Sequence, residues 1–252
     1  MERRIYQNIT LSIYQTREEM GRAAAREAAD YMTDLIDKKQ RINCVLAAAP
    51  SQNEFLKALV EYADIDWGRV NAFHMDEYVG FAVGDRRAFN GYLSRHIFEK
   101  VPFGEVFLIN GEADPEAECR RYGALLWDYP PDIVFMGIGE NGHIAFNDPE
   151  VADFEDAELV KAVKLARSCR QQQVNDGCFA RLEDVPTHAI TLTIPALLNA
   201  QKLFCMVPGI RKAQAVRNAL TGPVSERCPA SILQTKPGTD MYLDAEAASL
   251  LP

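Results

Sequence analysis

The sequence predicts an α/β fold in which helices cover both faces of a mostly parallel sheet. Three observations support this prediction. Short apolar, β-branched segments alternate along the chain with longer segments of helical period. Residues 42–48 are apolar except for Asn43, as in a strand buried on both faces. The chain contains no internal repeat or long linker, so we expect a single domain over residues 1–252.

The expected elements follow in order from the N-terminus. Residues 9–14 alternate as a strand does, and residues 17–38 carry apolar side chains at helical spacing. The further expected strands are 42–48, 70–73, 106–109, 132–137, 189–194 and 203–207. The further expected helices start at Ser51 as N-cap, near residue 88, at Asp114 followed by Pro115, and near residue 210. A small excursion from the domain is expected around residues 145–185.

Composition excludes several classes of protein. The chain has 27 Lys and Arg against 36 Asp and Glu, a net charge of −9, so nucleic acid is not an expected partner. No apolar run is long enough for a membrane span, and residues 1–15 lack a signal-peptide core, so we expect a cytoplasmic protein without a membrane partner. The six cysteines form no CxxC pair, which favours free thiols.

Ligands of such folds bind outside the carboxyl ends of the strands. Five segments follow expected strands and are searched on that basis: 47–52, 74–80, 137–149, 168–173 and 208–213. Gly137, Gly139 and Gly142 form a GxGxxG pattern, which raises the possibility of a dinucleotide site. Residues 143–149 make a poor helix start, however, so we favour glycines that let the backbone approach a small ligand.

Two groups in these segments are candidates for acid–base chemistry. His143 is flanked by Asn141 and Asp148, either of which can orient its imidazole. Asp76 and Glu77 follow a strand directly, where a carboxylate can serve as a base facing the pocket. The alternatives are a structural histidine and a solvated acidic turn.

A third group is a candidate phosphate site. Arg170, Lys212 and a helix start at Ser51 would combine a guanidinium fork, a point charge and backbone N–H groups. Taken separately, Arg170 and Lys212 are each typical of basic residues on a protein surface.

Three segments carry a resemblance to a known family. VNAFHMDEYVGF (70–81), DIVFMGIGENGHIAFNDP (132–149) and HAITLTIPALLNAQKLFCMVPGIRKAQAVRNAL (188–220) resemble, in this order, the glucosamine-6-phosphate deaminase/isomerase family. The resemblance spans about residues 7–243. The related 6-phosphogluconolactonases share GxGxxGH, but HIAFND here is similar to the deaminase branch.

The resemblance implies a Rossmann-like three-layer sandwich that opens an aminosugar phosphate ring, converts aldose to ketose and releases ammonia without a metal or other cofactor. Asp76 then moves a proton between C2 and C1, and His143 opens the ring with help from Asn141 and Asp148. The residues it implies at the substrate, including its phosphate, are Ala48, Ala49, Ser51, Glu77, Gly139, Gly142, Arg170 and Lys212.

The chain departs from the family pattern at several positions. Asn141 replaces an aspartate, Asp148 a glutamate and His74 an asparagine, and Pro50 lies in the usually glycine-rich phosphate loop. We expect His74 to influence sugar specificity. Residues 151–165 lack the basic cluster of allosterically activated members.

Four functions therefore stay open at this point. A glucosamine-6-phosphate deaminase leads, followed by a galactosamine-6-phosphate isomerase, a lactonase-like hydrolase that uses His143 to activate water, and a sugar-phosphate sensor without activity. In each case the partner is a small sugar phosphate. A homo-oligomer stays open as well.

Overall fold

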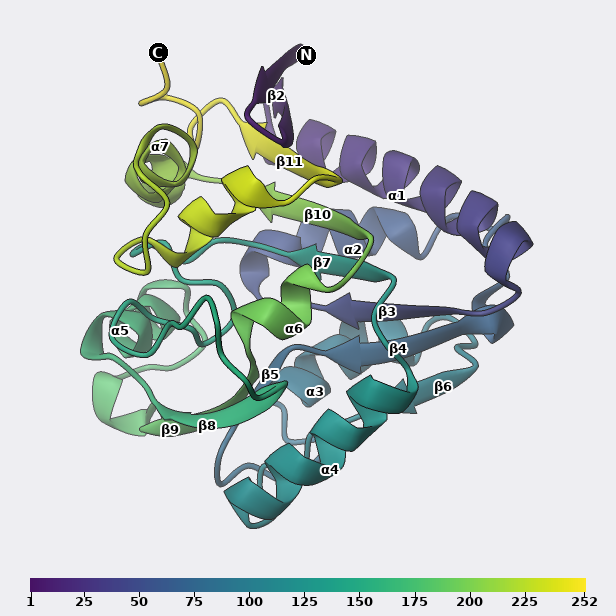
Figure 1. Cartoon of the computed structure of the whole chain (residues 1–252), viewed down its shortest axis with the longest axis vertical. Helices are drawn as coiled ribbons and strands as arrows, with labels where there is room; N and C mark the ends of the chain where they lie inside the picture. The colour runs from purple at the N-terminus through teal and green to yellow at the C-terminus, as the bar shows by residue number, and fades with distance from the viewer.

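A computed structural model describes all 252 residues and shows a central sheet of eight strands with helices on both faces (Figure 1). The strand order is β1-β2-β11-β10-β7-β3-β4-β6, and all neighbouring pairs are parallel except β1 and β2. The strands are β1 (Glu2–Tyr6), β2 (Ile9–Tyr14), β3 (Ile42–Leu46), β4 (Val70–His74), β6 (Glu105–Phe107), β7 (Ile133–Met136), β10 (Lys202–Val207) and β11 (Thr239–Asp244). The predicted fold class is confirmed.

Alternate residues of the central strands face two separate hydrophobic cores. In β10, Phe204 and Met206 pack into one core, whereas Leu203, Cys205 and Val207 pack into the other. Because side chains alternate along a strand, a strand covered on both faces must be apolar throughout. This accounts for the continuous apolar runs in the sequence.

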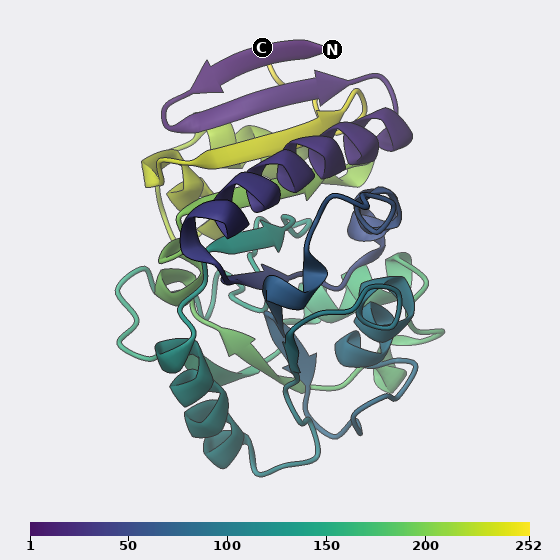
Figure 2. The same ribbon diagram turned by 90° about the vertical axis from the view of Figure 1, so that its right-hand side faces the viewer.

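Three helices cover each face of the central sheet. On one face lie α1 (Arg17–Lys39), α2 (Asn53–Leu59) and α3 (Phe89–Leu93), and on the other lie α4 (Pro115–Asp128), α6 (Ile194–Leu198) and α7 (Ala213–Thr221). Figure 2 faces α1 and shows this helix running along β11 and the N-terminal strands. No helix is both long enough and apolar enough to cross a bilayer.

A second, antiparallel sheet lies beside the central one, in the order β5-β9-β8. It consists of β5 (Asp76–Tyr78), β8 (Val160–Lys164) and β9 (His188–Leu192). Of this region, β8 and α5 (Arg167–Asn175) fall within residues 145–185, where an excursion was expected. The prediction of residues 189–194 as a central strand was wrong. Residues 189, 190 and 192 are apolar and fully buried, as the residues of a central strand are. Their sequence therefore does not show to which sheet the strand belongs.

Two helices, α1 and α4, start where the sequence predicted, and α2 differs from the prediction in its N-cap. Thr16 caps α1 through a hydrogen bond from Glu19 N, and Asp114 caps α4 ahead of Pro115. Ser51 is not the N-cap expected for α2, because residues Pro50–Gln52 form a 3₁₀ turn that leads directly into the helix.

Candidate active site

The carboxyl ends of the central strands open onto a cavity of about 410 Å³, a size suited to a small metabolite. Its walls include residues that follow β3, β4, β7 and β10, together with part of α5. All five segments searched on the basis of the sequence contribute to it. The rule that ligands bind at this edge of a parallel sheet therefore located the cavity correctly.

Asp76 lies in the wall of this cavity, where the chain passes from β4 into β5. The residue is only 7% exposed. Burial, reinforced by the neighbouring charge of Glu77, raises the pKa of Asp76 well above its ordinary value. A carboxylate that is costly to ionise has a high affinity for a proton, which a general base requires.

Glu77 was expected to contact the substrate, but it does not line the cavity. Successive side chains of a strand point to opposite faces, so Glu77 of β5 turns away from the cavity that Asp76 lines. Its carboxylate is fully buried and accepts hydrogen bonds from the N–H groups of Tyr78, Phe89 and Asn90, at 2.9, 3.0 and 2.8 Å. Glu77 therefore ties β5 to the start of α3.

His74, which was expected to influence sugar specificity, does not line the cavity either. It is fully buried, accepts a hydrogen bond at Nε2 from Ile109 N (2.9 Å) and donates from Nδ1 to the Asp76 carbonyl (2.8 Å). Burial lowers the pKa of His74 to about 4, so the ring is neutral at physiological pH. His74 holds the backbone that carries Asp76.

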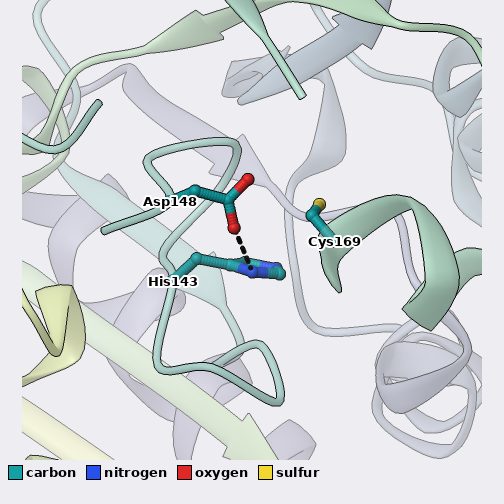
Figure 3. A group of neighbouring side chains, drawn as sticks. All are labelled: His143, Asp148 and Cys169. Carbon is teal, nitrogen blue, oxygen red and sulfur yellow. Dashed lines mark ion pairs between the residues drawn. The ribbon is translucent and has the colours of Figure 1, made fainter. Parts of the chain in front are cut away.

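The imidazole of His143 lies in the wall of the same cavity and is held by Asn141 and Asp148. Figure 3 shows the pairing of the ring with Asp148. The ring Nδ1 lies 2.7 Å from Asn141 Oδ1 and 3.2 Å from Asp148 Oδ1. Asn141 Nδ2 in turn donates to Asp148 Oδ1 at 2.8 Å. With Nδ1 occupied in this way, Nε2 is left free to exchange a proton with a ligand. The expected contacts of Asn141 and Asp148 with His143 are confirmed.

Asp148 remains a carboxylate in this arrangement. Burial alone would raise its pKa, but the hydrogen bond and charge of His143 and the amide of Asn141 outweigh burial and lower it. His143, Asp148 and the buried Cys169 each offer one potential metal ligand, all within 4.8 Å of one another. Burial raises the pKa of the Cys169 thiol well above its ordinary value, which disfavours the thiolate that binds metals.

Position 139 requires a glycine because its backbone lies against the ring of His143. A Cβ at this position would lie 2.2 Å from the His143 ring, too close for any side chain. The backbone N–H of Gly139 also donates a hydrogen bond to the His143 carbonyl, at 2.9 Å. The glycine thus gives the imidazole its place in the cavity wall.

We expect Gly139→Ala to lower kcat/KM roughly 100-fold or more, because displacement of a catalytic group by about 1 Å has effects of this size. The measurement is steady-state turnover of the proposed substrate below. Gly68→Ala is the matched control, since its added Cβ would meet only an ordinary contact of 3.5 Å. Equal activity in the two variants would show that His143 need not occupy this position.

Gly142 was expected to contact the substrate, but it is absent from the cavity walls. Its φ is +86°, and a Cβ would lie 2.7 Å from Cys228 Sγ, so the glycine is required for a turn and for packing. Residues 143–149 form no helix. The GxGxxG pattern therefore lacks the helix N-terminus that a dinucleotide site uses, as the sequence indicated.

The structure brings together only some of the residues that were expected to bind the phosphate. Lys212 is 8% exposed and lines the cavity, as do Ala48, Ala49 and Ser51. Arg170 does not: its guanidinium donates to the carbonyls of Leu182 (2.7 Å) and Val185 (2.8 Å). Arg170 therefore holds a loop in this structure, a role that a basic residue near a strand end also serves.

Two arginines that the sequence reasoning missed line the cavity instead. Arg211 lies next to Lys212 and pairs with Asp176 (3.1 Å). Arg17, in the first turn of α1, pairs with Glu54 (3.0 Å) and keeps a buried Nε without a partner. The strand-end rule, applied also to residues 9–14, would have drawn attention to Arg17, because β2 is parallel to β11.

Comparisons with known proteins agree with this geometry. A family model described as glucosamine-6-phosphate isomerases/6-phosphogluconolactonase matches residues 15–242. A glucosamine-6-phosphate deaminase of Listeria welshimeri is 43% identical over 83% of this chain and 88% of its own length. One from Streptococcus pneumoniae is 39% identical over 82% of this chain and 86% of its own length.

Solved structures show the same relationship. The structure of a monomeric glucosamine-6-phosphate deaminase superposes with a TM-score of 0.86 at 31% identity, covering 95% of this chain and 99% of that one. A 6-phosphogluconolactonase from Trypanosoma brucei has a TM-score of 0.80 at 15% identity, covering 98% of this chain and 100% of that one, and so shares the fold. The chain belongs to the family of glucosamine-6-phosphate isomerases and 6-phosphogluconolactonases.

Proposed function

We propose that the chain is a glucosamine-6-phosphate deaminase, which converts glucosamine 6-phosphate and water to fructose 6-phosphate and ammonia. The observation that carries the proposal is the pair Asp76 and His143. A buried carboxylate of raised pKa and an oriented imidazole line one cavity, together with a buried lysine. The relatives at 39–43% identity bear the name of this activity.

His143 is assigned to ring opening. The free Nε2 takes the proton of the O1 hydroxyl and returns one to the ring oxygen, so the C1–O5 bond breaks and C1 becomes an aldehyde. Asn141 and Asp148 fix the tautomer through Nδ1. Asp148, as a carboxylate, also stabilises the imidazolium that forms between the two transfers.

Asp76 is assigned to the isomerisation. Its carboxylate removes the C2 proton of the open-chain aldehyde and delivers it to C1, through an enol-type intermediate. Over the two transfers, O1 becomes a hydroxyl and the C2 amino group gives up one proton to become an imine. Hydrolysis of the resulting imine at C2 by water yields the ketone and releases ammonia. Because C1 and C2 are adjacent, one fixed carboxylate reaches both atoms.

The basic end of the cavity is assigned to the phosphate. Lys212 and Arg211 follow β10, and Ser51 lies in the opposite loop after β3. Burial lowers the pKa of Lys212, while Asp176 and Glu140 oppose this effect. A bound phosphate stabilises the charged form of the lysine and anchors the reacting carbons at Asp76 and His143.

The activity is tested by measuring ammonia and ketose phosphate released from glucosamine 6-phosphate, with galactosamine 6-phosphate and 6-phosphogluconolactone in parallel. We expect release from the first compound. Release from galactosamine 6-phosphate alone would assign the other sugar, and hydrolysis of the lactone alone would overturn the deaminase. Binding without turnover of any compound would identify a sensor.

We expect Lys212→Gln to raise KM for glucosamine 6-phosphate about 10- to 100-fold, since a charge-assisted hydrogen bond contributes roughly 1.5–3 kcal/mol. Arg170→Gln should leave KM unchanged and lower Tm instead, because it removes bonds to two loop carbonyls. Steady-state kinetics and thermal unfolding of both variants separate the two effects. An increase of KM in Arg170→Gln alone would reverse the assignment.

A further inference from the structure

A second cavity, of about 160 Å³, lies beside the active site and shares with it the loop Ala48, Ala49 and Pro50, together with Phe89 and Gln173. Arg86, Arg87 and Arg95 line this cavity, and none of its lining residues is Asp or Glu. Neither Lys212 nor Arg211 reaches it. Because Asp85 pairs with Arg87, the charge of this cavity comes from two guanidinium groups without a carboxylate partner, and in a chain of net charge −9 they form a local anion-attracting field.

Two of the three guanidinium groups have hydrogen-bond donors to spare. Arg87 is neutralised by Asp85, at 2.6 Å. Arg86 makes no hydrogen bond or ion pair through its side chain, and Arg95 donates only to the Arg86 carbonyl, at 2.9 Å. Guanidinium groups free of carboxylates bind oxyanions through paired N–H groups.

The rest of the cavity wall is aromatic and apolar. Tyr78, Phe89, Tyr92 and Phe179 contribute rings, and Gln173 contributes a side-chain amide that makes no hydrogen bond within the protein. Tyr92 donates to the carbonyl of Ala49 at 2.8 Å, so this wall is fixed to the shared loop. The wall suits a ligand with a charged end and a small carbon skeleton.

We propose that this cavity is a second anion site that binds inorganic phosphate or a small phosphomonoester through Arg86 and Arg95. The site is distinct from the proposed substrate phosphate site because the two cavities share no cationic residue. It does not depend on the proposed function, since it rests on the arginines and the aromatic wall alone.

The experiment measures binding of inorganic phosphate by calorimetry at low ionic strength, in a Lys212→Gln background that weakens the first site. We expect Arg86→Gln/Arg95→Gln to weaken the remaining binding about tenfold or more. The matched control is Arg22→Gln/Arg26→Gln, which removes the same charge from exposed positions on α1. Equal binding in the two double variants, or no binding in the Lys212→Gln background, would overturn the proposal.

A local readout comes from Cys178, a lining residue of the second cavity and the only exposed cysteine. Alkylation by iodoacetamide is followed by peptide mass spectrometry with and without inorganic phosphate. We expect phosphate to slow alkylation of Cys178 at least threefold and to leave Cys119 unchanged. An effect of phosphate on both thiols, or on neither, would contradict binding in this cavity.

Discussion

Replacing Asp76 with asparagine is expected to lower kcat/KM by roughly 10²- to 10⁴-fold, the range contributed by a positioned general base. The amide has nearly the same shape but cannot accept the C2 proton. Substrate binding should persist, because the phosphate is assigned to the far end of the cavity. The measurements are turnover of glucosamine 6-phosphate and binding of the substrate in the same variant.

Stability serves as the control for this variant. The raised pKa means that an ionised Asp76 costs folding free energy at neutral pH, so the neutral amide should leave Tm unchanged or raise it. A fall in Tm together with lost binding would indicate misfolding. Full turnover in a folded variant would remove the proton transfer from Asp76.

The pH profile of the wild-type protein gives an independent check. Asp76 acts as a carboxylate, and burial raises its pKa, so activity should rise with pH through a value above the ordinary 3.8. The acid limb of kcat/KM therefore lies at a higher pH than an exposed aspartate would give. Activity that persists unchanged down to about pH 4 would contradict a raised pKa in the working enzyme.

The fold was predictable where composition alone determines the position of an element. Apolar runs without alternation, such as β3 and β7, identified the central sheet, because strands buried on both faces have this pattern. The assignment of β9 failed for the same reason, since its buried residues match those of a central strand. Strand partners are set by tertiary packing, which no local pattern records.

The site was predictable where a residue's backbone position fixes its direction. Asp76, His143 and Lys212 follow strands whose ends meet at one edge, and all three line the cavity. Glu77 and Arg170 have the right chemistry and neighbourhood but turn towards buried backbone groups instead. The sequence shows which residues lie near an edge, whereas packing decides which of them face the ligand.

The other large effect is expected for His143→Gln, which should lower kcat roughly 10²- to 10⁴-fold. Glutamine cannot exchange a proton near neutral pH, so it cannot open the sugar ring. The oxygen atoms of Asn141 and Asp148 that accept from the imidazole Nδ1 would then orient a group with no acid–base role. Ammonia release from glucosamine 6-phosphate measures the loss.

A second measurement separates the role of His143 from that of Asp76. The open-chain form of fructose 6-phosphate, once bound, can exchange its C1 hydrogen with deuterated water. Because this exchange needs only the base at C1, His143→Gln should retain it, whereas Asp76→Asn should lose it. Loss of exchange in both variants would mean that the imidazole also takes part in the proton transfer between C2 and C1. Retention in His143→Gln alone would place the two residues at successive steps, with the imidazole acting before the carboxylate.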